Sequence, residues 1–316
     1  KESKNFTPLL EQIKSVYRNS TLLCLSLFYF LTFGSFVAFT VYLPNFLVSN
    51  FGLDEVDAGM RTAGFIALAT LLRPVGGWLG DRFNPFKVLM LMFTGLTISG
   101  IILSFSPDIF LYTIGCLTVA ICAGIGNGTI FKLVPLYFMK QGGIVNGIVS
   151  AMGGLGGFFP PLVLTFLFGI MGHYAIGFMA LSQVALASLI IVIFMYYTEK
   201  LSTANDIIEH TGQGIMITDS NGIIQRVNDA FTKVTGYEPE EVIGKTQRVL
   251  SSGKHNKDFY DNMWNQIEAT GHWQGEIWNK RKNGELYKEL LTISKINQGS
   301  GENYFYAGMF SEMTER

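Results

Sequence analysis

Charged residues are distributed very unevenly along this chain. Of the 47 Asp, Glu, Lys and Arg residues, 6 fall in residues 1–20, 11 in residues 21–197 and 30 in residues 198–316. A stretch of 177 residues with 11 charges cannot be covered by water. A single soluble globule is therefore excluded, and the pattern predicts a membrane domain followed by a soluble domain.

Six apolar runs are long enough to cross a bilayer, at roughly 22–46, 58–80, 87–105, 109–134, 143–169 and 173–197. Basic residues gather on one side of these runs, among them Arg18, Arg82, Lys87, Lys140 and Lys200. Because basic loops stay in the cytoplasm, both ends of the membrane domain should be cytoplasmic. We expect a multi-pass protein in the lipid bilayer of a bacterial-type inner membrane. Its parts would be a lead-in at 1–20, six helices at 21–198 and a soluble domain at 199–316.

The hydrophobic period changes after the sixth run. A short separate helix is predicted at Ala204–His210, followed by strands at Gly214–Thr218 and Ile223–Val227 that meet at Ser220-Asn221-Gly222, a hairpin signal. Further helices are expected at 228–236 and 256–269, and strands at 272–281, 284–297 and 302–312, with turns at Lys282–Gly284 and Gly299–Gly301. This order predicts an α+β domain with helices grouped on an antiparallel sheet.

Several function classes are not supported by the residues present. The net charge of −1 gives no electrostatic footprint for nucleic acid. The three cysteines lie in apolar runs without His or Cys at ligand spacing, which argues against a metal site or a disulfide framework. No nucleophile elbow, phosphate loop, kinase motif or cyclase motif is present, so we do not expect an enzyme.

Glycine-rich motifs carry a family resemblance in the membrane domain. The segment Gly76-Gly-Trp-Leu-Gly-Asp-Arg-Phe-Asn-Pro85 resembles the signature loop of the major facilitator superfamily, in which Asp81 and Arg82 would form the gating loop. The segments Ala123–Phe138, Ser150–Pro161 and Leu25–Phe36 are similar to those of the nitrate/nitrite porter family. Small residues alone would indicate only close helix packing. The resemblance covers about residues 15–197, so the predicted fold is an all-α polytopic domain of six helices, half of a major facilitator fold.

Arg73 is the most informative single residue. It would lie roughly 10 Å inside the cytoplasmic boundary at 1.5 Å per residue. A charge at that depth faces a watery cavity or a counter-charge, or else snorkels to the interface. A planar guanidinium suits a planar oxyanion such as nitrate or nitrite. The porter resemblance implies that Arg73, in Arg73-Pro-Val-Gly-Gly77, is a substrate ligand and that Tyr29 lines the same site.

Other small or polar residues would complete that substrate site. Asn127 and Gly126 on the fourth helix, and Gly153 and Gly154 on the fifth, would let backbone approach the anion. For Asn127, an interhelical hydrogen bond is an equally good interpretation.

The resemblance leaves the mode of action open. It matches only the C-terminal six of twelve helices, so we expect a missing N-terminal six-helix half, either cut away or supplied by another polypeptide. Asp, Glu and His are absent from the interiors of the predicted spans, which favours anion exchange over proton coupling. The alternatives are a nitrate receptor that signals to a kinase or diguanylate cyclase, and a facilitator of another anion.

The soluble half resembles a PAS sensor domain over residues 203–316. The resemblance rests on Asp219–Phe231, Thr235–Gly244, Gly271–Gly284 and the closing Phe310–Arg316. Trp264 and Asn279 match positions of the flavin-binding branch, which implies FAD, although Thr246 departs from the usual Asn. The alternative is a ligand-free domain in which the tryptophans pack a core. His210, His255 and His272 should be solvated, and a downstream signalling domain would complete the output.

Overall fold

The computed structural model describes residues 9–105, 108–172, 175–297 and 304–313, with only the backbone described for part of helices α1 and α6. The chain divides into two compact units, Lys1–Tyr197 and Thr198–Arg316, and each is described by itself. The predicted turn at Gly299–Gly301 lies outside the described residues.

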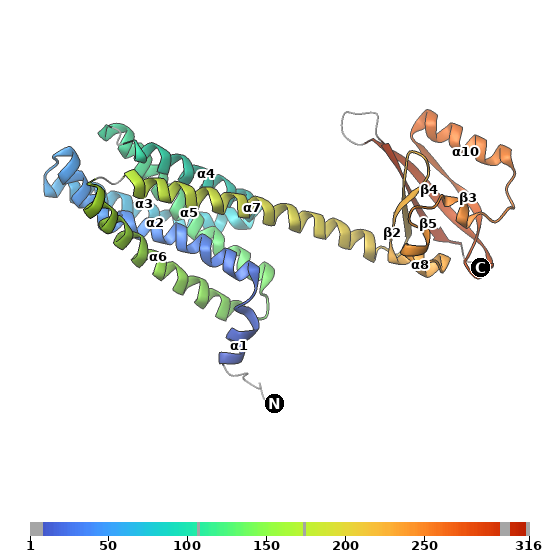
Figure 1. Cartoon of the computed structure of the whole chain (residues 1–316), viewed down its shortest axis with the longest axis horizontal. Helices are drawn as coiled ribbons and strands as arrows, with labels where there is room; N and C mark the ends of the chain where they lie inside the picture. Colours follow the sequence, from blue (N-terminus) through green and yellow to red (C-terminus); the bar gives the residue numbers. More distant parts are fainter. Residues whose placement is uncertain (1–8, 106–107, 173–174, 298–303, 314–316) are drawn as a thin grey trace. The chain divides into compact units, whose positions relative to one another are not determined.

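The first unit is entirely helical in its described part (Figure 1). Its elements are α1 Leu9–Val16, α2 Ser20–Phe51, α3 Glu55–Arg82, α4 Pro85–Ser104, α5 Ile109–Tyr137, α6 Gly142–Met171 and the first part of α7 Ala175–His210. Helices α2 to α7 are each long and apolar enough to cross a membrane, which confirms the six predicted spans. Helix α1 lies within the predicted lead-in and was not expected from the sequence.

Polar capping residues fix where the spans begin. The side chain before each of four helices accepts hydrogen bonds from the first free backbone N–H groups, as such residues do at helix starts. These caps are Asn19 before α2, Asp54 before α3, Asn84 before α4 and Asp108 before α5. Short polar side chains therefore divide an otherwise continuous apolar sequence into separate helices.

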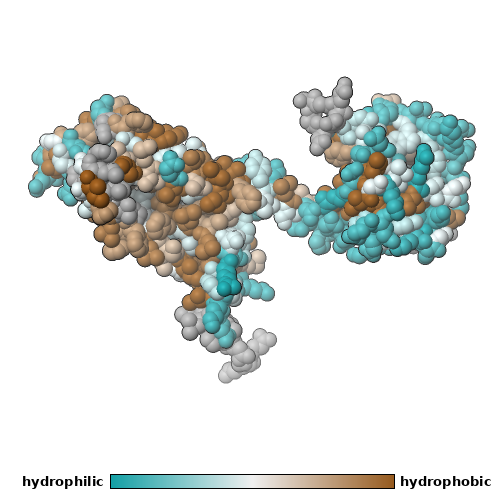
Figure 2. Space-filling view, viewed as in Figure 1, coloured by the Kyte–Doolittle hydropathy of each residue, from teal (hydrophilic) through white to brown (hydrophobic). Residues whose placement is uncertain are grey.

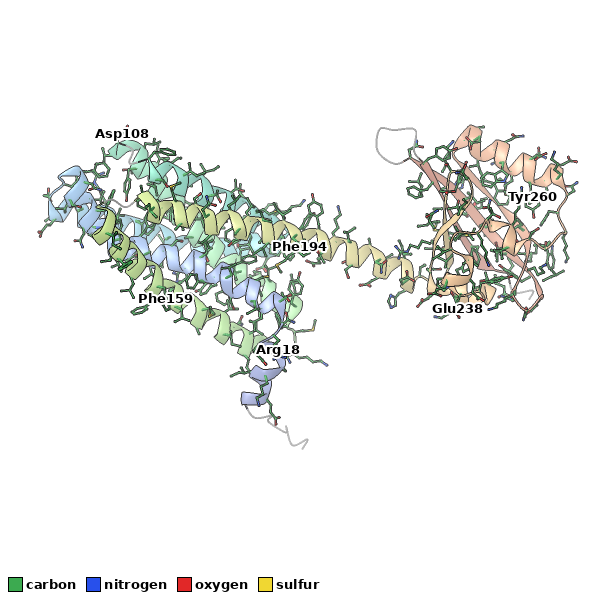
Figure 3. The ribbon with its side chains drawn as sticks, in the orientation of Figure 1. Arg18, Asp108, Phe159, Phe194, Glu238 and Tyr260 are labelled. Carbon is green, nitrogen blue, oxygen red and sulfur yellow. The ribbon has the colours of Figure 1, made fainter. Side chains whose placement is uncertain are left out.

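Apolar side chains cover the outside of this unit. Figure 2 shows a largely hydrophobic surface over its helices. Phe159 on α6 and Phe194 on α7, both labelled in Figure 3, are 51% and 71% exposed. Such a surface is stable in hydrocarbon and not in water.

Glycines allow two pairs of helices to approach closely. A Cβ added at Gly128 of α5 would lie 2.0 Å from the backbone oxygen of Arg73 on α3. A Cβ at Gly156 of α6 would lie 2.2 Å from the backbone oxygen of Phe30 on α2. The glycine-rich motifs therefore set backbone-to-backbone contacts between α3 and α5 and between α2 and α6, as small residues commonly do in membranes.

Helix α7 corrects one prediction. The apolar pattern predicts a sixth span that ends near residue 197 and a separate short helix at Ala204–His210, whereas α7 is continuous from Ala175 to His210. The break was wrong because neither Gly nor Pro occurs in residues 198–210, so nothing ends the helix before Gly212.

The second unit contains a five-stranded antiparallel sheet in the order β2-β1-β5-β4-β3. The strands are β1 Gly214–Asp219, β2 Ile224–Val227, β3 His272–Lys280, β4 Leu286–Asn297 and β5 Tyr304–Glu312. The helices are α8 Asp229–Thr235, α9 Pro239–Val242, the short 3₁₀ helix η1 Gln247–Leu250 and α10 Lys257–Thr270. The predicted strands and the α8 and α10 helices are confirmed, whereas α9 and η1 were not predicted.

The predicted hairpin joins β1 and β2. Gly222 has φ 76°, and its N–H donates to the Asp219 carbonyl at 3.0 Å. Asp219 Oδ1 accepts from the N–H groups of Asn221 and Ile223, both at 2.9 Å. An Asx turn and a residue with positive φ thus close the hairpin.

The second unit has a hydrophobic core of its own. Phe231 on α8, Ile267 on α10 and Phe310 on β5 are at most 2% exposed and belong to one cluster. Phe231 packs against Phe310 in an edge contact, with ring centroids 5.9 Å apart. Because this core closes within residues 198–316, we expect the unit to fold by itself.

Candidate anion site and ligand cavity

Arg73 lies on α3 between aromatic rings. Its guanidinium carbon is 4.9 Å from the ring centroid of Phe36 and 5.2 Å from that of Phe33, both on α2. Its Nε is buried and has no hydrogen-bond partner. Among the described residues, no carboxylate lies within ion-pair distance of this guanidinium. Cation–π contacts hold the group, and its Nε donor is left without a partner among the described residues.

Tyr29 lies near Arg73, one helical turn before Phe33 on α2. The two residues share Phe33 as a neighbour: the Tyr29 ring stacks on Phe33 at 5.4 Å between centroids, and the Arg73 guanidinium carbon lies 5.2 Å from the same ring. A Cβ at Gly153 would lie 2.3 Å from the Tyr29 ring. The structure therefore brings Arg73, Tyr29 and Gly153 together.

Asn127 is 3% exposed, and neither its Oδ1 nor its Nδ2 has a hydrogen-bond partner. Its neighbour Gly126 contacts Thr32 on α2, where a Cβ would lie 2.9 Å from the threonine methyl group. The interhelical hydrogen bond offered as an alternative for Asn127 is therefore not formed. Gly154 is exposed on α6, and nothing lies within 4 Å of an added Cβ there. It is therefore not packed with the other predicted site residues.

The predicted gating loop is largely helical. Helix α3 continues through Asp81 and Arg82, so the loop before α4 consists of Phe83 and Asn84. The expectation that Asp81 and Arg82 lie in a loop was wrong, because both belong to the last turn of α3, whose nearby glycines pack against α5. Asp81 Oδ2 accepts a hydrogen bond from Lys132 Nζ at 2.7 Å, which ties α3 to α5.

In the second unit, a cavity of about 910 Å³ lies on the inner face of the sheet. Residues of β1, β3, β4 and β5, of η1 and of α10 line it, including both Trp264 and Asn279. The volume is within the range of small-molecule sites. Trp264 is half-buried and makes an edge contact with Tyr306, with centroids 5.1 Å apart.

Asn279 is paired with a buried carboxyl group that the sequence analysis missed. Its Nδ2 donates to Oε1 of Glu289 on β4 at 2.9 Å. Glu289 is 1% exposed and lines the cavity, and its Oε2 has no hydrogen-bond partner of normal geometry. Burial raises the pKa of Glu289 to about 7, and the neighbouring Tyr287 hydroxyl and Asn279 amide offset part of that cost.

His255 is not solvated as expected. It is half-buried, its Nε2 accepts the backbone N–H of Trp278 at 2.8 Å, and its ring stacks on Phe259 at 4.1 Å between centroids. Burial lowers the pKa of His255, and the charge of Lys254 lowers it further. His210 and His272 are exposed, as predicted.

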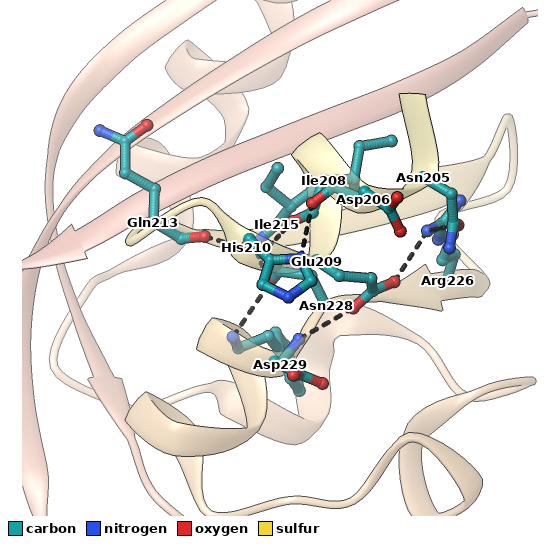
Figure 4. A network of polar contacts seen from close by, with 11 residues as sticks. Asn205, Asp206, Ile208, Glu209, His210, Gln213, Ile215, Arg226, Asn228 and Asp229 are labelled. Atoms are coloured by element: carbon teal, nitrogen blue, oxygen red, sulfur yellow. Dashed lines mark hydrogen bonds and ion pairs between the residues drawn. The ribbon is translucent and has the colours of Figure 1, made fainter. Parts of the chain in front are cut away.

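The end of α7 is fastened to the sheet by buried and charged groups (Figure 4). Asn228 is 1% exposed; its Nδ2 donates to the Ile208 carbonyl, and its Oδ1 accepts from the Ile215 N–H, both at 2.8 Å. Glu209 Oε1 accepts from Arg226 Nη2 at 2.8 Å. These contacts join the last turn of α7 to β1 and β2.

Among the described residues, no three His, Cys, Asp or Glu side chains are grouped as metal ligands. The two candidate sites are the arginine between aromatic rings in the first unit and the cavity in the second.

Comparison with protein families identifies the first unit. The model of the Major Facilitator Superfamily matches residues 25–243, more than half of the chain. The chain belongs to the major facilitator superfamily. A PAS domain model matches residues 212–315, so the facilitator helices are followed by a PAS domain. The overlap of the two matches, residues 212–243, falls in the unit that contains the sheet.

Curated relatives match a little less than two thirds of the chain. The "Nitrite extrusion protein" of Bacillus subtilis (strain 168) is 67% identical over 202 residues, covering 64% of this chain and 51% of that protein. The "Probable nitrate transporter NarT" of Staphylococcus epidermidis is 54% identical over 199 residues, with 63% and 51% covered. The chain thus spans about half the length of these relatives.

Solved structures similar to this chain cover the PAS domain. A PAS domain from Colwellia psychrerythraea has a TM-score of 0.35 and 22% identity, over 37% of this chain and 98% of that chain. A LOV domain of the Erythrobacter litoralis EL346 blue-light activated histidine kinase has a TM-score of 0.31 and 21% identity, over 34% and 100%.

Proposed function

We propose that this multi-pass facilitator chain forms part of a transporter of nitrate or nitrite, with Arg73 as an anion ligand. The observation that carries the proposal is the partly buried guanidinium held by Phe33 and Phe36, with an unpartnered Nε and no carboxylate among the described residues. An intramembrane charge is costly without a counter-ion, so a mobile planar anion would supply one. Arginine donors match such an anion in a bidentate manner.

Tyr29 and Asn127 would complete the anion site. Tyr29 and Arg73 pack on the same Phe33 ring, and the unpartnered Nδ2 of Asn127 would donate a hydrogen bond to a bound oxyanion. The relatives described as a nitrite extrusion protein and a nitrate transporter support the choice of anion. In this fold the substrate lies between two six-helix halves, so transport would also require an N-terminal half. Both ends of the present membrane unit would be cytoplasmic.

Uptake of isotopically labelled nitrate and nitrite by vesicles containing the full-length protein tests this proposal. Arg73→Ala should abolish uptake. Arg61→Ala serves as the matched control, because Arg61 lies on the same helix but is exposed and paired with Asp57 at 3.2 Å. Equal uptake by the wild type and the Arg73→Ala variant would refute the role of Arg73.

Two arms of the same assay resolve the mode of transport. Exchange predicts that nitrite inside the vesicles accelerates nitrate entry, because the interiors of the predicted spans contain no Asp, Glu or His for proton coupling. Competition by chloride or formate would instead indicate a facilitator of other anions.

The PAS domain would regulate transport or report it. Helix α7 contains the sixth apolar span, and in its last turn Glu209 forms an ion pair with Arg226 of the PAS domain. That continuity also favours a second candidate, a nitrate receptor that relays occupancy to a signalling output. Specific nitrate binding without flux in the vesicles would favour the receptor.

We further propose FAD as the ligand of the PAS cavity. The residues fit a flavin: Trp264 supplies an aromatic wall, Asn279 a side-chain amide, and Glu289 a buried carboxyl oxygen without a hydrogen-bond partner of normal geometry. A bound flavin would supply a redox-active ring, while the chain's own residues bind and orient it. The absorbance spectrum of gently purified full-length protein tests this, since a spectrum without oxidised-flavin bands that stays unchanged after incubation with FAD would exclude it.

A further inference from the structure

Glu289 is an unusual group to find in the wall of a ligand cavity. It is 1% exposed, and Oε2 has no hydrogen-bond partner of normal geometry. A buried carboxylate normally collects hydrogen bonds or an ion pair, because an unpaired buried charge is costly. The carboxyl therefore has unused hydrogen-bonding capacity at the position where a ligand would lie.

The position of this carboxyl is fixed from two sides. Glu289 follows Tyr287 on the inner face of β4, and Ile277 on β3 is its register partner. Oε1 accepts the Asn279 amide at 2.9 Å, and Asn279 is in turn bridged to Ser251 through the backbone. With Oε1 occupied by Asn279 and β3 held in place, Oε2 is the atom left for a ligand, and the Tyr287 hydroxyl is its polar neighbour.

We propose that Glu289 recognises the ligand of the PAS cavity in its protonated form. Its Oε2–H group donates a hydrogen bond to a carbonyl oxygen or ring nitrogen at the edge of a planar heteroaromatic ligand. Asn279 orients the carboxyl through Oε1. Ligand occupancy of the PAS cavity is thereby linked to the uptake of one proton. The ligand class rests on the flavin proposed above, because the pyrimidine edge of that ring carries such acceptors.

Burial favours a proton at this site, whereas the neighbouring Tyr287, Asn279 and Arg281 favour the ionised form. Burial of Glu289 raises its pKa to about 7. The groups that act on it directly are Tyr287, Asn279 and Arg281. Other titratable or charged groups that line the cavity are Arg248 on η1, Lys257, Tyr260 and Asp261 on α10, and Tyr306 on β5. Tyr306 donates its hydroxyl to Glu268 of α10 at 2.7 Å. A ligand acceptor would favour the protonated carboxyl, whereas the carboxylate would repel it.

The test is a titration of the full chain in detergent micelles with oxidised FAD, followed by flavin fluorescence at pH 6 and pH 8. With a pKa near 7 and one linked proton, wild-type affinity should be about tenfold higher at pH 6 than at pH 8. Glu289→Gln should bind equally at both pH values, because an amide keeps a donor. Asp261→Asn, which alters an exposed carboxyl lining the same cavity, should retain the tenfold difference.

A second readout does not depend on flavin. The carboxyl carbon of Glu289 in ¹³C-labelled protein should titrate near pH 7 by NMR, and this signal should vanish in Glu289→Gln. The inference is overturned if the wild type binds FAD with equal affinity at both pH values, or if the pH dependence survives in Glu289→Gln. Either result would leave FAD binding itself intact. The absence of FAD binding at both pH values overturns the proposed cofactor and this inference with it.

Discussion

The buried carboxyl of Glu289 makes a quantitative prediction about the stability of the PAS domain. Its pKa is about 7 in the folded protein, against an ordinary value of 4.5. The folded state therefore binds this proton more tightly than the unfolded state. Wild-type stability should fall as pH rises through the window from 4.5 to 7, and the loss is complete above the folded pKa.

The magnitude follows from those two values. A tenfold change in a protonation equilibrium is worth about 1.4 kcal/mol. Ionisation of Glu289 should therefore cost the folded domain about 3 kcal/mol at pH 8. Glu289→Gln keeps the shape and the oxygen that accepts the Asn279 hydrogen bond, but it cannot ionise. The variant should gain stability over wild type by about that amount at pH 8 and show little of this gain at pH 4.

Urea denaturation of residues 198–316, followed by tryptophan fluorescence, measures this difference at several pH values. Glu276→Gln is the matched control, because Glu276 is a half-exposed carboxylate on β3 that pairs with Lys288. Its difference from wild type should stay within about 1 kcal/mol throughout. A difference between Glu289→Gln and wild type that does not change from pH 4 to pH 8 would refute the reasoning.

Two further predictions concern packing and pH. Gly128→Ala would place a Cβ 2.0 Å from the backbone oxygen of Arg73, so this variant should lose the monodisperse peak in detergent gel filtration. Gly59→Ala should keep the peak, because there is open space around Gly59. Equal behaviour of the two variants would contradict the close crossing of α3 and α5. The pKa of His255 is lowered in the folded state, so its contribution to stability is present above the unfolded pKa of 6.5 and lost as pH falls through the folded value. Protonation removes the acceptor for the Trp278 N–H, and hydrogen exchange of that amide, corrected for its intrinsic rate, should accelerate at low pH; constant protection would contradict this.

Local sequence signals predicted most elements of both units. Asn-Gly at 221–222 indicates a tight turn by itself, because the turn needs a positive φ that glycine adopts freely. Apolar runs with few charges indicate spans in the same direct way. Two of the missed elements, α9 and η1, are only four residues each, while the third, α1, has eight. Four residues are too few to show a helical period, so the sequence pattern could not reveal them.

The polar partners in the sites depended on tertiary structure. Lys132 pairs with Asp81, which lies 51 positions away in the sequence and on another helix. Glu289 follows Asn279 by ten residues, and only the pairing of β3 with β4 brings the two side chains together. Their juxtaposition depends on the register between strands, which the hydrophobic pattern constrains to a face but not to a specific partner.

The sequence by itself determined where the chain is apolar, where it turns, and that an arginine occupies a span, because these properties depend on composition and on residues close in the chain. The tertiary structure decided that Arg73 lies against Phe33 and Phe36 and that Glu289 faces a cavity with an unpartnered oxygen. Those features arise from contacts between distant segments, and the cost of burying a polar group is fixed only when the packed neighbours that surround it are known.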